Sequence, residues 1–184
     1  MSGATLSFPP ASRELLDNHP GPRAPGMSLR HAQDTDLDFF REIYAQSRAS
    51  EVAAMPWSAE ARRAFCDSQF DLQHRHYVTE HAHGHFLVVQ HEGAAIGRLY
   101  LDRQANELWL IDVLLDQAWR GHGRGTALLA WMQALVVNLR LDALRLHVLQ
   151  YNLDARRLYE RHGFVLEATE GAHLRMVWHQ LNMA

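Results

Sequence analysis

The sequence predicts one mixed α/β domain built on a mostly antiparallel sheet. Short apolar runs typical of strands occupy 86–90, 95–101 and 108–115. From Leu128 the apolar residues instead follow the helical period of about 3.6 residues. With 184 residues, 47% of them hydrophobic, the chain is long enough to bury a single core.

The N-terminal 26 residues differ in composition from the rest of the chain. They hold five of the six prolines and their apolar spacing is weak, so we expect a mobile extension over 1–26 and a folded domain over 27–184. Met27 resembles a start-codon product, and our hypothesis is that the extension is dispensable. Loss of folding on truncation at Met27 would refute it.

Two helices precede the sheet in the predicted order. Helical spacing over 37–44, behind Asp34, predicts the first, and Ser58 is a suitable N-cap for a second helix that runs through Leu72. Polar residues separate the three strand-like runs that follow, which is typical of an antiparallel meander.

The second half of the chain continues with alternating elements. A helix of about four turns over 128–139 leads to a strand at 144–149. Asn152 can cap a short helix that ends near His162, with Gly163 as its left-handed stop.

A hairpin formed by 164–168 and 174–179 closes the fold. Leu174, Met176 and Trp178 alternate along its second strand. These residues could present an apolar face to a second copy of the chain and give a homodimer, or they could pack within one subunit.

Composition narrows the functional classes. The net charge of −3 argues against bulk attraction to nucleic acid, so phosphate binding has to be local. Cys66, the single cysteine, falls in a helical pattern and is expected to be a small buried hydrophobe. No apolar run approaches the roughly 18 residues of a membrane span, and we see no signal segment, so we expect a cytoplasmic protein without membrane partners.

The most informative segment is the glycine-rich turn Arg120–Thr126, between a strand-like run and a helical pattern. Glycines allow backbone N–H groups to approach a ligand, and the first turn of a helix leaves N–H donors unpaired at the positive end of its dipole. Arg120 and Arg124 would oppose that dipole unless an anion binds there. The turn therefore predicts a phosphate site.

Beyond this physical argument, the chain resembles the GNAT superfamily of N-acetyltransferases over most of residues 27–180. The strand 111–115 runs into Arg120-x-x-Gly123-x-Gly125, which matches the superfamily's Arg/Gln-x-x-Gly-x-Gly/Ala signature. The block from Leu146 through Asn152 to Gly163-Phe164 is similar to the second motif, and the order of elements agrees.

The resemblance implies a sheet of six to seven strands flanked by about four helices and splayed between strands 4 and 5. It also implies acetyl-CoA as cosubstrate, with its pyrophosphate on the glycine turn and its pantetheine arm paired with the backbone of Val113 and Leu115, since an open strand edge invites such pairing. The full set of expected cofactor-binding residues is Val113, Leu114, Leu115, Arg120, Gly121, His122, Gly123, Arg124, Gly125, Thr126, Asn152, Ala155 and Arg156.

Three residues are candidates for catalysis. The resemblance places the hydroxyl of Tyr159 near the thioester sulfur, and a tyrosine with a pKa near 10 can protonate the leaving thiolate. Glu107 and Asp112 are alternative bases for the attacking amine. Glu107 has a spacing similar to that of a catalytic glutamate in some histone-acetylating relatives, and Asp112 lies in an otherwise apolar strand, where a carboxylate requires a partner or a role. Ordered water alone is a further alternative.

The acceptor side is less defined. Arg48, Trp57 and Tyr100 are the candidate substrate-binding residues, on the expectation that the first two helices and their connection overhang the acetyl group. The alternation of His81, His83 and His85 could ligate zinc on a strand, but Gly84 favours a loop and we expect no metal.

The predicted activity is acetyl-CoA-dependent N-acetylation of a primary amine, on a small molecule or a protein, by direct attack in a ternary complex. The alternative is a catalytically inactive module that binds and senses acyl-CoA. A nucleotide P-loop is disfavoured because the lysine of its signature is missing.

Overall fold

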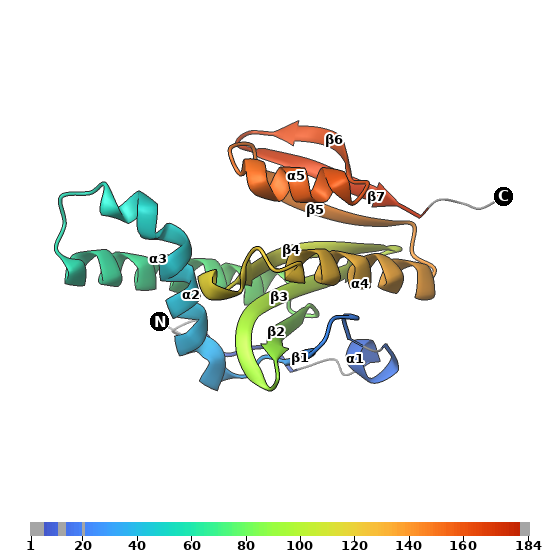
Figure 1. Cartoon of the computed structure of the whole chain (residues 1–184), viewed down its shortest axis with the longest axis horizontal. Coiled ribbons are helices and arrows are strands. Elements are labelled where there is room, and N and C mark those ends of the chain that lie inside the picture. Colours follow the sequence, from blue (N-terminus) through green and yellow to red (C-terminus); the bar gives the residue numbers. More distant parts are fainter. Residues whose placement is uncertain (1–5, 11–13, 20, 181–184) are drawn as a thin grey trace.

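A computed structural model describes residues 6–10, 14–19 and 21–180 of the chain. Its centre is a sheet with the order β1-β2-β3-β4-β5-β7-β6 (Figure 1). The strands are β1 (Met27–His31), β2 (His85–His91), β3 (Ala94–Gln104), β4 (Glu107–Leu115), β5 (Ala143–Leu149), β6 (Val165–Glu170) and β7 (His173–His179). The helices are α1 (Glu14–Asn18), α2 (Leu37–Ala53), α3 (Ala59–Glu80), α4 (Arg124–Asn138) and α5 (Leu153–Arg161), with short 3-10 turns at Asp34–Asp36 and Gln117–Trp119.

Helices cover both faces of the sheet, with α4 and α5 on one face and α2 and α3 on the other (Figure 1). Alternate residues of β2 and β3 enter two different cores. Leu99 and Leu101 of β3 belong to the core between the sheet and α4, whereas Tyr100 packs with the aromatic residues of α2 and α3 on the other face of the sheet. This mixed, mostly antiparallel sheet with its parallel β4–β5 pair confirms the predicted fold class.

The parallel pair β4–β5 is short, and this feature positions the site. Residues of β4 pair with β5 only from Glu107 to Leu110, although β4 continues to Leu115 along β3. The β3–β4 register shifts by one residue at Ile111, which is a β-bulge. A bulge bends its strand and increases its twist. The separation of the two strands therefore begins at the bulged residue.

The described parts of the N-terminal region are packed against the domain. The ring of Phe8 lies 4.7 Å from the imidazole of His74 and 5.6 Å from the ring of Phe86, and Leu15 of α1 is only 6% exposed. Isolated apolar residues thus contact the domain from a segment that lacks periodic spacing, and the division into an extension over 1–26 and a domain over 27–184 stays a prediction. Residues 1–5, 11–13 and 20 of that segment, and 181–184 at the other end, lie outside the described residues.

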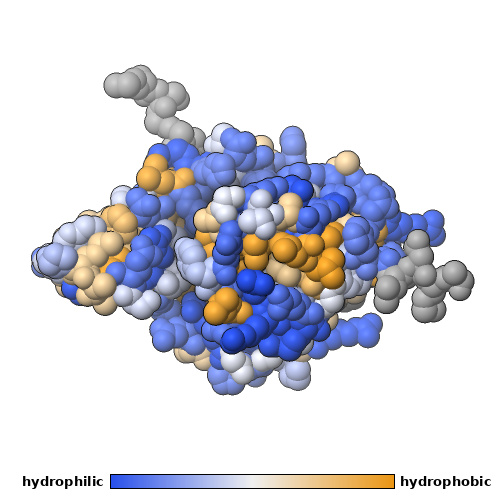
Figure 2. All heavy atoms as spheres, turned by 90° about the horizontal axis from the view of Figure 1, so that it is seen from above, coloured by the Kyte–Doolittle hydropathy of each residue, from blue (hydrophilic) through white to orange (hydrophobic). Residues whose placement is uncertain are grey.

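The closing hairpin uses its apolar face within the chain. Leu174 and Met176 are buried, and Trp178 packs against the same core. The face suggested for a homodimer is thus occupied. In Figure 2, which views the molecule from the β6 side, apolar atoms gather within a mostly polar face. Val165 and Leu166 of β6, each 57% exposed, belong to this side.

Candidate active site

A cleft of about 720 Å³ opens where β4 and β5 separate. Its walls come from the C-terminal half of α3, the open parts of β4 and β5, the start of α5 and the β6–β7 turn. The lining residues are Gln73, His76, Tyr77, His81, Gln104, Trp109, Leu110, Ile111, Asp112, Val113, His147, Val148, Leu149, Asn152, Tyr159, Glu170 and His173.

The cleft passes through the sheet. Asp112 lies opposite Tyr100 and Trp109 lies opposite Asp102, so both side chains are on the face covered by α2 and α3. Tyr159 instead belongs to the core on the α4 face. Because Asp112 and Tyr159 line the same cleft, a ligand can be reached from one face by a carboxylate and from the other by a phenol.

Tyr159 is well suited to hold its proton. Its side chain is 7% exposed, and its ring packs 5.7 Å from that of Phe164. Burial, followed by the negative charge of Asp112, raises the pKa of Tyr159 to about 12. The hydroxyl is therefore protonated at neutral pH and can donate a hydrogen bond or a proton.

Asp112 is fixed by a buried arginine. The Nε of Arg98 donates to Oδ2 of Asp112 at 2.6 Å, and its Nη2 donates to Oε1 of Gln73 at 2.9 Å. The guanidinium also lies over the rings of Phe70 and Tyr100, at 5.5 and 5.4 Å. Burial disfavours the charged form of Arg98, but the nearby Asp112 carboxylate stabilises that form and keeps the pKa of Arg98 above its usual value. Asp112 therefore has both the partner and the orientation that its place in an apolar strand requires.

The open edge of β4 offers backbone groups to a ligand. The amide of Asp116 donates to the carbonyl oxygen of Ile96 on β3 at 2.8 Å. Successive residues of a strand direct their N–H and C=O groups to opposite edges, so Leu114 also faces β3 whereas Val113 and Leu115 face the gap. The carbonyl oxygen of Leu115 accepts a bond from Nε of Arg120 at 2.9 Å, and its N–H remains directed at the opening.

The glycine turn stands at the end of this open edge. Gly123 is the N-cap of α4 with φ of 76°, a left-handed conformation that Gly121 shares and that other residues adopt at a cost. A Cβ on Gly125 would lie 3.2 Å from Leu158 of α5, so this glycine allows close packing of the two helices. The guanidinium of Arg124 lies 4.4 Å over the ring of Trp119, and His122 is exposed.

Helix α5 begins beside the same opening. The Oδ1 of Asn152 accepts a bond from the Ala155 amide at 3.2 Å, which confirms the predicted N-cap, and Asn152 also lines the cleft. Arg156 in the first turn reaches Glu160 at 3.3 Å. Since β4 and β5 are parallel and each is followed by a helix that runs back, α4 and α5 both begin at the same end of the cleft (Figure 1).

Of the six residues predicted for catalysis or acceptor binding, four lie outside the lining of the cleft. Glu107 is at the paired end of β4 in an ion pair with Arg145, a position that does not favour it as the base. Tyr100 is 1% exposed in the aromatic core. Arg48 bonds Glu51 and the hydroxyl of Tyr44 on α2.

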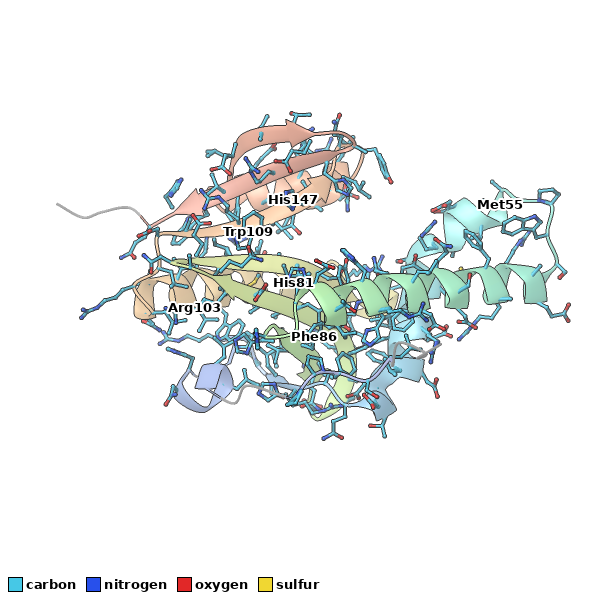
Figure 3. All side chains as sticks on the ribbon, turned by 180° about the vertical axis from the view of Figure 1, so that it is seen from behind. Met55, His81, Phe86, Arg103, Trp109 and His147 are labelled. Carbon is cyan, nitrogen blue, oxygen red and sulfur yellow. The ribbon has the colours of Figure 1, made fainter. Side chains whose placement is uncertain are left out.

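Trp57 packs 5.2 Å from Phe65 in the connection between α2 and α3. In Figure 3, Met55 of that connection lies at the far end of the helix pair from His81, Trp109 and His147. The C-terminal half of α3, rather than its connection to α2, thus lines the cleft.

Sequence reasoning missed Arg98 and the outer wall of the cleft. Trp109 and His147 have ring centroids 5.4 Å apart, and Nε2 of His147 lies 3.1 Å from a carboxylate oxygen of Glu170. A signal for Arg98 was present, because it is a charge inside the apolar run 95–101, as Asp112 is in the adjacent strand. Opposite charges in two buried neighbouring strands indicate an ion pair.

The histidine-rich segment forms no metal centre in the part of the chain that the structure describes, where no three His, Cys, Asp or Glu residues are grouped for a metal. His81 ends α3, and its Nδ1 lies 2.7 Å from Oδ2 of Asp102. Among the described helices, none is long and apolar enough to cross a bilayer.

Comparisons with known proteins identify the family of this chain. Residues 38–164 match the Acetyltransferase (GNAT) family. The L-amino acid N-acetyltransferase AaaT of Escherichia coli (strain K12) is 26% identical over 147 residues, which cover 77% of this chain and 84% of the relative.

Two solved structures share the fold. PaiA N-acetyltransferase from Thermoplasma acidophilum, in complex with coenzyme A, has a TM-score of 0.65 at 20% identity, covering 84% of this chain and 99% of that one. Spermidine N-acetyltransferase from Vibrio cholerae, in complex with CoA and spermine, has a TM-score of 0.59 at 19% identity, covering 84% and 96%. With the family match spanning more than half of its length, the chain belongs to the GNAT family of acetyltransferases.

Proposed function

We propose that this enzyme transfers the acetyl group of acetyl-CoA to a primary amine by direct attack in a ternary complex. The observation that carries the proposal is the cleft through the sheet beyond Leu110, with the glycine turn at the end of its open strand edge. An extended amide-containing arm can pair with a strand edge, and a pyrophosphate can bind at a helix N-terminus. The solved relative PaiA is in complex with coenzyme A, which supports this choice of ligand.

Each part of the cofactor has a candidate partner. The amides of residues 121–126 would bind the pyrophosphate, with Arg120 and Arg124 beside it. The pantetheine arm would pair with the backbone N–H and C=O groups of Val113 and Leu115. Leu114 lies between them, and its backbone faces β3. Asn152, Ala155 and Arg156 would flank the arm from the start of α5.

Acetyl-CoA supplies an activated acetyl carbonyl. The amine nitrogen forms a bond to the carbonyl carbon, the carbon–sulfur bond breaks, and its electron pair leaves with the sulfur. Tyr159, protonated and on the α4 face, donates a proton to the departing thiolate. Asp112, on the opposite face, takes up the proton of the acceptor ammonium before attack, directly or through water. The second proton, which the nitrogen loses as the amide forms, restores the phenol of Tyr159 through water.

The names of two relatives support an amine acceptor, since one acts on L-amino acids and the other on spermidine. The distribution of groups in the cleft agrees, because it brings a carboxylate to the face from which an acceptor would enter.

The proposal is tested by measuring coenzyme A thiol release from acetyl-CoA over a panel of amines. Tyr159→Phe should lower kcat by about 10² or more while coenzyme A affinity is retained. Tyr151→Phe is the matched control, because Tyr151 precedes the same helix but is 75% exposed and lies outside the cleft lining. Binding of coenzyme A without thiol release from any amine would instead indicate the acyl-CoA-binding module.

A further inference from the structure

The acceptor side of the cleft has a restricted set of charges. The cleft is lined by aliphatic, aromatic, amide and imidazole side chains and by two carboxylates, Asp112 and Glu170, and its lining contains no arginine or lysine among the described residues. The sequence contains no lysine at all. Arg98 lies behind Asp112 and is 2% exposed, so its charge is directed at that carboxylate rather than at a ligand.

Asp112 is the carboxylate available to an ammonium group. Its Oδ2 accepts the bond from Arg98, and among the described residues no donor occupies Oδ1. The side chain retains 19% exposure and lines the cleft. Glu170, in contrast, is already engaged by His147 and by Arg175, at 3.1 and 2.5 Å.

An anionic group on the acceptor would find no cationic partner in the lining comparable to what Asp112 offers an ammonium group. Of the four imidazoles in the lining, His81 is bonded to Asp102 and His147 to Glu170. A carboxylate beside the amino group would lie about 5 Å from Asp112. Repulsion at that distance, at an effective dielectric constant of about 20, corresponds to roughly 100-fold in binding.

We propose that the acceptor is a primary amine without a carboxylate beside its amino group, held by Asp112 and packed against Trp109. This inference rests on the proposed function and specifies its acceptor class. Arg98 is a positioning residue that orients the Asp112 carboxylate. The paired rings of Trp109 and His147 form the wall that receives the uncharged body of the amine.

The test compares matched acceptors with the wild-type enzyme: 2-phenylethylamine with phenylalanine, tyramine with tyrosine, and histamine with histidine. Each amine should exceed its amino acid by at least about tenfold in kcat/KM. Equal or better use of the amino acids would overturn the inference and assign carboxylate recognition to His76 and His173.

Two variants test whether Asp112 is the residue that makes the enzyme prefer amines over amino acids. Asp112→Asn should raise KM for the amines and reduce the amine-to-amino-acid ratio at least severalfold. Asp71→Asn is the matched control, because Asp71 of α3 forms an Asp–Arg pair with Arg41 of α2 at 2.8 Å, outside the cleft lining. It should leave the ratio unchanged, and an unchanged ratio in Asp112→Asn would contradict the role given to Asp112.

Calorimetry separates this inference from the proposed function. Amines that fail to bind the coenzyme A complex, while coenzyme A itself binds, would overturn the acceptor class alone. Failure of coenzyme A to bind would overturn the proposed function. Because the chain has no lysine, acetylation of its own side-chain amines cannot add to the measured turnover.

Discussion

The ion pair between Arg98 and Asp112 should be the most strongly coupled pair near the cleft. We consider Arg98→Met and Asp112→Ala separately and together. Removing only Asp112 leaves a guanidinium that is 2% exposed without its carboxylate, with the neutral side chain of Gln73 as a hydrogen-bond partner. Removing only Arg98 leaves a carboxylate that is 19% exposed.

The magnitude follows from the geometry. The Nε–Oδ2 distance of 2.6 Å places the two charge centres about 4 Å apart, which corresponds to about 4 kcal/mol at an effective dielectric constant of about 20. Solvent access to Asp112 weakens this attraction, and breaking a buried pair on one side commonly costs about 3–5 kcal/mol. We therefore expect each single variant to lose about 3 kcal/mol of unfolding free energy and the pair to show a coupling of about 2–4 kcal/mol.

The assay is urea unfolding of the wild type, both single variants and the double variant, followed by circular dichroism. The Arg41–Asp71 pair serves as the control cycle, since its side chains are 21% and 31% exposed and its coupling should stay below about 1 kcal/mol. A coupling for Arg98 and Asp112 no larger than that of the control would refute the reasoning that Arg98 fixes the carboxylate.

Three further outcomes are expected. Gly123→Ala should weaken coenzyme A binding measured by calorimetry, whereas Gly93→Ala, with the same left-handed backbone and open space around its Cβ, should cost similar stability, on the order of 1–2 kcal/mol, without changing affinity. Asn152→Ala should lose about 1 kcal/mol of stability through its cap, and Ser58→Ala, which removes the cap of α3, should match that loss in urea unfolding without affecting coenzyme A binding. Burial raises the pKa of Tyr159 from about 10 to about 12, so the contribution of its protonated hydroxyl to stability is complete below pH 10 and is lost as the pH rises toward 12. Across that interval the wild type should therefore lose about 2–3 kcal/mol more unfolding free energy than Tyr159→Phe. Equal losses would contradict the burial argument.

Local signals in the sequence predicted the elements that frame the site. Ser58 caps α3 through a bond from the Ala61 amide, and Gly163 ends α5 with φ of 81°. These residues act through their immediate neighbours, so their type and spacing are sufficient. The length of α3 was underestimated, because its apolar spacing weakens after Leu72 while polar residues continue the helix to Glu80.

Long-range packing accounts for the differences at the acceptor side. Tyr100 is aromatic with a polar hydroxyl, as residues that line ligand pockets often are, but strand alternation directs its side chain into the core, where it packs between Phe86 and Tyr77. The bulge at Ile111 brings Asp112 onto the same face as Trp109, and no local pattern encodes that extra residue. The partners of Phe8 lie far along the chain, so composition alone does not predict these contacts.

The account depends most on where the cofactor lies, and amide hydrogen exchange with and without coenzyme A measures this directly. Coenzyme A should slow exchange at Val113, Leu115 and the turn 121–126, and should leave Leu114 unchanged because its amide already faces β3. Unchanged exchange at Val113 and Leu115, or protection confined to the other face of α4 around Trp131, would contradict binding in the gap between β4 and β5.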